Sequence, residues 1–216
     1  MKRKKKLLVL LLAAAMLAMS ACKGLTPDDA KTYVQSVLDA SYKADFAEYT
    51  KQTDSTEEEA RALYDENMDN IMEMGGFNDA GLSEELTANY RQLFQDMLAK
   101  AKYEVGEAAE DEDGNFTVQV SAEPFAGFDG LEDEVMAAVE AEFANITDIS
   151  QFPSDEEINE MVFQMMYDIL VERMENPAYG EAQTVELHVE LADNVYSVNE
   201  DDLTALDGIL FPSDNF

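Results

Sequence analysis

Apolar side chains recur at helical spacing in five long stretches of the chain. The first stretch follows Thr26-Pro27-Asp28-Asp29, where a capping threonine, a proline and early carboxylates form a typical helix start. The last follows Ser154-Asp155-Glu156-Glu157, which has the spacing of a capping box. This spacing predicts helices over about residues 27–46, 55–75, 83–101, 130–146 and 154–176.

The helix expected over 154–176 has the widest apolar stripe, so it is predicted to be the most buried helix of the fold. Its apolar side chains are Ile158, Met161, Val162, Met165, Met166, Ile169 and Leu170.

Alternating apolar and polar residues predict two β-hairpins. The first pairs residues 103–109 with 116–122, and the second pairs 185–191 with 195–198 around Asp193-Asn194. The side chains expected to face the core are Phe116, Val118, Val120, Val185, Leu187, Val189 and Leu191. With a short terminal helix near 200–206, the pattern predicts an α+β fold. About five longer helices pack on an antiparallel sheet made of two hairpins, preceded by a signal-peptide helix.

The two hairpins resemble each other in sequence. Gly106-Glu107-Ala108 and Gly180-Glu181-Ala182 open them, and each hairpin follows a helix pair. A duplicated helix–helix–hairpin unit over 55–122 and 130–198 would explain the likeness. The alternative is that the two hairpins are unrelated, because the interval from the first glycine to the turn differs between them.

Residues 1–22 have a different pattern. Five basic residues at positions 2–6 precede an apolar stretch of 12 residues, Leu7 to Ala18, which is shorter than the roughly 20 residues of a membrane-spanning helix. Small residues then lead to Cys22, the single cysteine of the chain. The segment therefore predicts a secretory signal that is cleaved between Ala21 and Cys22.

Met19-Ser20-Ala21-Cys22 resembles a lipobox, with Met19 where the family usually has leucine. The resemblance implies that Cys22 receives a diacylglyceryl group and holds the protein on membrane lipid at the outer face of the cell membrane. Two acyl chains give stable anchoring. The expected domains are the signal peptide 1–21, the lipidated cysteine and tether 22–25, and a single extracytoplasmic domain 26–216. The alternative is an ordinary cleaved signal followed by a free thiol.

The charge of the chain excludes several kinds of partner. Its 47 acidic residues all follow position 21, whereas five of the 14 basic residues precede it, so the mature net charge would be about −38. Nucleic acid is excluded, because phosphate binding needs a cationic surface. Cations and cationic ligands fit this charge. Disulfides need a second cysteine, and Cys22 with His188 alone does not make a structural zinc site.

The acidic clusters fall where helices are expected to begin, so we interpret them as complements to the helix dipole instead of metal sites. His188, the single histidine, lies between Glu186 and Glu190 on the polar side of a predicted strand, where a solvated role is expected. No nucleophile elbow or phosphate-binding loop occurs. These patterns predict no metal, no cofactor and no enzymatic activity. A hydrolase that uses a pair of carboxylates stays as the alternative.

The loop 124–130 is the candidate for a ligand surface, because Phe125 and Phe128 flank Gly127. Aromatic side chains on such a loop can line the mouth of a pocket. They can equally pack beneath the sheet and direct the chain into the next helix.

The chain resembles a family of small acidic lipoproteins of Gram-positive anaerobes. The resemblance rests on the lipobox and on residues 26–31, 38–43, 81–86 and 178–182. It implies membrane attachment and a shared fold, and it transfers no catalytic residue. Such lipoproteins sometimes resemble cystatin-like or NTF2-like domains, but five helices exceed that pattern.

The leading hypothesis is therefore a membrane-anchored, non-enzymatic binding or scaffolding module. A carboxylate-dependent hydrolase of the cell wall and an accessory solute-binding lipoprotein are the alternatives.

Overall fold

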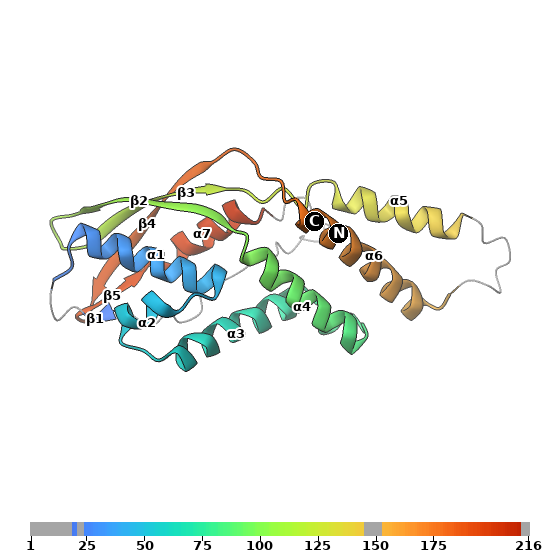
Figure 1. Cartoon of the computed structure of the whole chain (residues 1–216), viewed down its shortest axis with the longest axis horizontal. Helices are drawn as coiled ribbons and strands as arrows, with labels where there is room; N and C mark the ends of the chain where they lie inside the picture. Colours follow the sequence, from blue (N-terminus) through green and yellow to red (C-terminus); the bar gives the residue numbers. More distant parts are fainter. Residues whose placement is uncertain (1–18, 21–23, 145–152, 213–216) are drawn as a thin grey trace, which may run out of the picture.

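A computed structural model describes residues 19–20, 24–144 and 153–212 of the chain (Figure 1). The predicted signal-peptide helix and Cys22 therefore lie outside the described residues. Met19 and Ser20 form a two-residue strand, β1 (Met19–Ser20), which pairs with the edge of the sheet.

The described part of the chain has the predicted α+β fold. The helices are α1 (Pro27–Lys43), α2 (Ala47–Thr53), α3 (Glu57–Met74), α4 (Glu84–Leu98), α5 (Leu131–Phe143), α6 (Asp155–Glu175) and α7 (Glu200–Leu210). The longer strands are β2 (Lys102–Glu110), β3 (Phe116–Glu123), β4 (Gln183–Ala192) and β5 (Val195–Val198). Neighbouring strands run antiparallel in the order β1-β5-β4-β3-β2, so the two predicted hairpins join into one sheet through β3 and β4.

Side-chain capping fixes where most helices begin. Thr26, Thr56 and Ser154 each accept a hydrogen bond from the backbone N–H three residues later, and the carboxylate at that later position accepts from the backbone of the capping residue. These capping boxes satisfy N–H groups that a helix start otherwise leaves unpaired. The predicted starts of these helices are confirmed, as is the start of α4 at Ser83.

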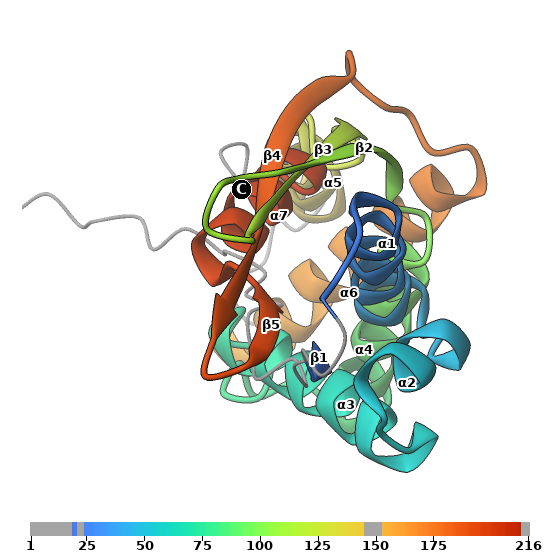
Figure 2. The ribbon, with the colours of Figure 1, turned by 90° about the vertical axis from the view of Figure 1, so that its left-hand side faces the viewer.

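The core lies between one face of the sheet and a layer of helices. Helices α1 and α7 cover this face, and α2, α3 and α4 pack outside α1 (Figures 1 and 2). The strand residues that form the buried face are Val105, Phe116, Val118, Val120, Ala122, Leu187, Val189, Tyr196 and Val198. The inward orientation predicted for the middle of both hairpins is therefore confirmed.

A β-bulge lies in the middle of β2. Val105 pairs with Val120 and Ala108 with Val118, so two residues of β2 face Gln119 alone. One of the two is Gly106, where a Cβ atom would lie 3.0 Å from the Gln119 carbonyl oxygen. Glycine therefore permits the close strand approach at this bulge.

Three predictions about individual elements were wrong. The first helix ends at Lys43, because Ala44 adopts a left-handed conformation (φ 51°), and the separate helix α2 follows. Leu191 is 38% exposed instead of buried, and it lies next to the last residue of β4. Helix α6 is not the most buried helix, since Leu170 and Met174 are its buried residues whereas nine residues of α1 are buried.

Candidate functional site

Helices α5 and α6 form a hairpin that extends beyond the body of the fold (Figure 1). We call this hairpin the arm (residues 131–144 and 153–176). Most of its apolar side chains are half-buried, and several of them pack against the core. The half-buried residues include Val139, Ile158, Met161, Val162, Met165, Met166 and Ile169, whereas Met136 is 54% exposed. The large apolar side chains that are exposed on its described residues are those of Met136 and Val171.

The arm is also strongly acidic. Its two helices carry 12 aspartates and glutamates and one basic residue, Arg173. That guanidinium is already engaged, since it donates to the carbonyl oxygens of Gly127 (2.7 Å) and Asp129 (3.0 Å) and pairs with the carboxylate of Glu134. On the arm, apolar side chains therefore lie among carboxylates that outnumber the basic residues.

A groove of about 390 Å³ lies where the base of α6 passes the end of α4. Its apolar walls are Leu93, Ala99, Val171 and Met174, and its charged rim is Asp96, Lys100 and Glu175. Val171 is 38% exposed, whereas Leu93 and Met174 are buried. The volume lies in the usual range of ligand sites.

Packing against α4 holds the groove wall of α6 in place. Tyr90 is fully buried, and its hydroxyl donates to the backbone carbonyl of Phe163 (2.6 Å). Its ring also contacts the rings of Phe77, Phe163 and Tyr167, with centroids 4.6, 6.0 and 5.6 Å away. The groove therefore lies between two helices whose spacing is fixed by aromatic packing.

The structure places the predicted aromatic loop in the core. Phe125 and Phe128 are 2% and 5% exposed, and their ring centroids are 5.4 Å apart. A Cβ atom on Gly127 would lie 2.1 Å from the Phe125 ring, so glycine is needed for this packing. Both rings are buried in the core, as in the alternative in which they pack beneath the sheet.

The acidic clusters occupy the first turns of α1, α3, α4, α5, α6 and α7, as predicted. Hydrogen bonds from the capping residues hold the pKa values of Asp29, Glu59 and Glu157 below their usual range. Within residues 19–20, 24–144 and 153–212, no group of three or more His, Cys, Asp or Glu residues could hold a metal ion. In α1, α3 and α6 one carboxylate of each cluster completes a capping box.

His188 has a partner that the sequence did not indicate. The Oδ2 atom of Asp202 lies 2.7 Å from Nδ1 of His188 and accepts the backbone N–H of the same residue at 2.8 Å. The side chain of His188 is 48% exposed. Because Asp202 also lies in the first turn of α7, this contact fastens that helix to β4.

Two carboxylates away from helix starts are bound by tyrosine hydroxyls. Tyr42 donates to Asp207 (2.6 Å), which is 1% exposed, and Tyr103 donates to Asp39 (2.7 Å). Burial alone would raise the pKa of Asp39. Hydrogen bonds from Lys43, Tyr103 and Gln35 together outweigh burial, so the net shift of this pKa is downward. The two tyrosine rings are 5.6 Å apart, and together these contacts tie α1 to β2 and α7.

Cys22 and Ala21, the predicted lipidation and cleavage residues, lie outside the described residues, so their placement stays a prediction. None of the helices in the described ranges combines the length and the hydropathy that crossing a bilayer requires.

Comparison with known proteins supports the fold. No family model and no curated protein matches the chain. The crystal structure of ycdA from Bacillus subtilis strain 168, a protein assigned as a lipoprotein, matches 85% of this chain with a TM-score of 0.57 and 18% sequence identity. The match covers 56% of the ycdA chain, so this chain spans little more than half of that structure. At this identity the likeness shows a shared fold.

Proposed function

We propose that this protein is a lipid-anchored, non-enzymatic binding module on the outer face of the cell membrane. In this proposal Cys22 carries the lipid, and the groove between α4 and α6 binds a basic, apolar segment of a partner protein. The observation that carries the proposal is the exposure of Val171, on the acidic helix α6, in the apolar groove between α4 and α6.

Charge complementarity selects this kind of occupant. Asp96 and Glu175 line the groove together with Lys100, and Asp168 and Glu172 are further exposed carboxylates next to Val171 on α6. An apolar side chain flanked by lysines or arginines would fill the groove and place its cations beside these carboxylates. A second copy of this chain would bring the same negative charge and be repelled.

Val171→Asp tests the groove. A synthetic amphipathic peptide of leucine and lysine is the probe, and binding is measured by calorimetry at physiological salt. The variant is expected to weaken binding by about tenfold or more, because a carboxylate in the apolar wall must lose water when the peptide binds. Met74→Asp, at an exposed position at the end of α3, is the matched control and is expected to bind as the wild type does.

The direction of the change in affinity distinguishes binding in the groove from attraction to the net negative charge of the protein. Val171→Asp makes the protein more negative, so binding by charge alone would be unchanged or tighter. Equal or tighter binding of the variant would therefore show that the groove is not the docking site.

The fold shared with an assigned lipoprotein supports the anchor, which Cys22→Ala tests. Expressed in a Gram-positive host, the wild type is expected to carry a diacylglyceryl mass and to stay with the membrane fraction. The variant is expected to lose both properties, because one thioether holds the acyl chains. A wild-type protein that is soluble and cleaved after Ala21 would show that the lipid anchor is wrong, and this result would not affect the proposal for the groove.

A further inference from the structure

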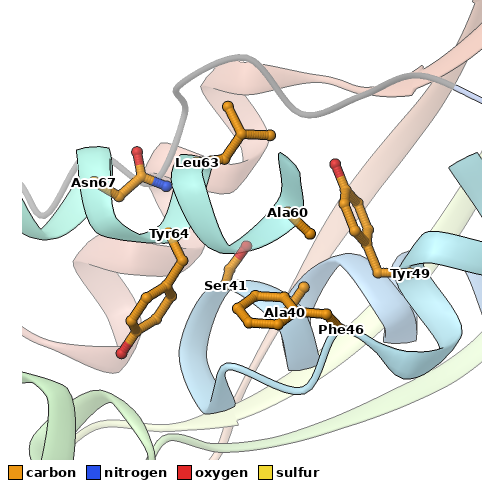
Figure 3. Close-up of a pocket in the computed structure, with 8 residues that line it drawn as sticks. All are labelled: Ala40, Ser41, Phe46, Tyr49, Ala60, Leu63, Tyr64 and Asn67. Atoms are coloured by element: carbon orange, nitrogen blue, oxygen red, sulfur yellow. The ribbon is translucent and has the colours of Figure 1, made fainter. Parts of the chain in front are cut away.

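The groove between α4 and α6 differs in size and charge from the pocket between α1, α2 and α3 (Figure 3). That pocket has room for about one water molecule, and none of the described side chains that line it is charged. The groove has a volume of about 390 Å³, and its rim carries the carboxylates of Asp96 and Glu175 and the ammonium of Lys100. Charges of both signs therefore lie around one apolar groove.

Both helices of the groove end beside it. Ser83, which caps the start of α4, donates its backbone N–H to the carboxylate of Glu160 in the first half of α6 (2.9 Å). At the other end, Lys100 lies two residues after the last residue of α4, and Glu175 is the last residue of α6. The two helices therefore run in the same direction, and the C-terminal end of each, where the helix dipole is negative, lies at the groove.

Glu175 is an exposed carboxylate at this end of α6. The dipole favours basic side chains at a helix C-terminus and disfavours acidic ones. The basic residue of the last turn, Arg173, pairs with Glu134 instead. Within residues 24–144 and 153–212, none of the ion pairs includes Glu175. The end of α6 therefore favours a cation that this part of the chain does not supply.

Lys100 is the groove residue of opposite charge. Its backbone is held on both sides, because its N–H donates to the Met97 carbonyl (3.1 Å) and its own carbonyl accepts the Tyr179 hydroxyl (2.8 Å). Lys100 is exposed, and among the described residues no carboxylate forms an ion pair with it, although Asp96 and Glu175 line the same groove. Its ammonium is therefore available to a carboxylate of a bound segment.

We propose that the segment bound in the groove carries charges of both signs, with lysine or arginine beside Glu175 and aspartate or glutamate beside Lys100. This inference rests on the proposed function of the groove and specifies the partner further. A segment with lysines on both sides of its apolar residue would bring an ammonium close to Lys100, and like charges repel. Lys100 is therefore the residue that selects the orientation and the sequence of the segment.

Two pairs of synthetic peptides test this role of Lys100. In the first pair, lysines precede two leucines, and either glutamate or glutamine follows them; in the second pair this order is reversed. Binding is measured by calorimetry at physiological salt. In one of the two orders, the glutamate peptide is expected to bind the wild type about two- to fivefold more tightly than the glutamine peptide, as for an exposed ion pair. Attraction to the net negative charge of the protein alone would favour the glutamine peptide, which is more positive.

Lys100→Gln is the test variant, and Lys31→Gln is its control. Both substitutions remove one positive charge from an exposed position, and Lys31 lies in α1 and does not line the groove. Lys100→Gln is expected to abolish the preference for the glutamate peptide, whereas Lys31→Gln is expected to keep it.

Two results would overturn this inference alone. One is binding of all four peptides that Val171→Asp weakens, with no preference for glutamate in either order. The other is a preference for glutamate that persists in Lys100→Gln, since a different cation would then cause it. If Val171→Asp does not weaken the binding of any peptide, the proposed function of the groove is wrong, and this inference is wrong with it.

Discussion

Raising the pH from about 9.5 to about 11.5 is expected to unfold this protein in one steep transition. Tyr33, Tyr42 and Tyr90 are each at most 1% exposed, and burial raises the pKa of all three hydroxyls above the ordinary value near 10. Asp207 beside Tyr42 raises that pKa further. The folded state therefore keeps these protons when the unfolded chain has lost them.

The sign of the dependence follows from this difference. A hydroxyl whose pKa is raised by folding contributes its full stability below the unfolded pKa, and the contribution falls as pH rises toward the folded pKa. Each such group lowers the free energy of unfolding by about 1.4 kcal/mol per pH unit, so the three together lower it by about 4 kcal/mol per pH unit. A domain with a free energy of unfolding of about 5–15 kcal/mol therefore unfolds within a few pH units.

Tyrosinate absorbance and circular dichroism, recorded together, check this expectation. The sequence has nine tyrosines and no tryptophan, so the absorbance change reports tyrosine ionisation alone. Both signals are expected to change in one transition. Complete ionisation near pH 10 with unchanged dichroism would show that these hydroxyls reach solvent in the folded state.

The sequence predicted elements whose signals are local. The capping boxes at Thr26, Thr56 and Ser154 depend on contacts across three residues, and strand alternation depends on contacts across two. Helix α2 was missed because its boundary is a left-handed Ala44, and nothing in Ala44-Asp45-Phe46 is a strong helix breaker.

The exposure of α6 could not be predicted in the same way. Its apolar residues extend around much of the helix, which is typical of a buried helix. Whether another layer covers such a helix depends on how far the hairpin extends past the sheet, and that is a property of the assembled fold. The groove at Val171 has the same origin, because Leu93 and Met174 meet only through packing of α4 on α6.

The sequence also places a polar residue on an apolar helical stripe. Asn67 lies three residues after Tyr64 and one turn before Ile71, on the apolar stripe of its helix. A polar residue on such a stripe is expected to be buried and to need a hydrogen-bond partner. The buried pair of Tyr42 and Asp207, 165 residues apart, had no such local signal.

Tyr90→Ala is expected to lower the free energy of unfolding by about 3–5 kcal/mol, a large part of the stability of a typical domain. The ring is completely buried and contacts four other aromatic rings, those of Phe77, Phe94, Phe163 and Tyr167. Removing it leaves a cavity where α4 meets α6, and the surrounding helices can close it only in part.

Tyr90→Phe separates the ring from its hydroxyl. The phenylalanine variant keeps the packing and loses the hydrogen bond to the Phe163 carbonyl, so it is expected to cost about 0.5–1.5 kcal/mol. Urea unfolding of the wild type and both variants measures the two costs. If the two variants lose equal and small amounts of stability, α6 does not depend on the aromatic cluster. A large loss in the alanine variant alone, with faster hydrogen exchange in α6, would instead establish that the Tyr90 ring holds the arm and its groove to the body of the fold.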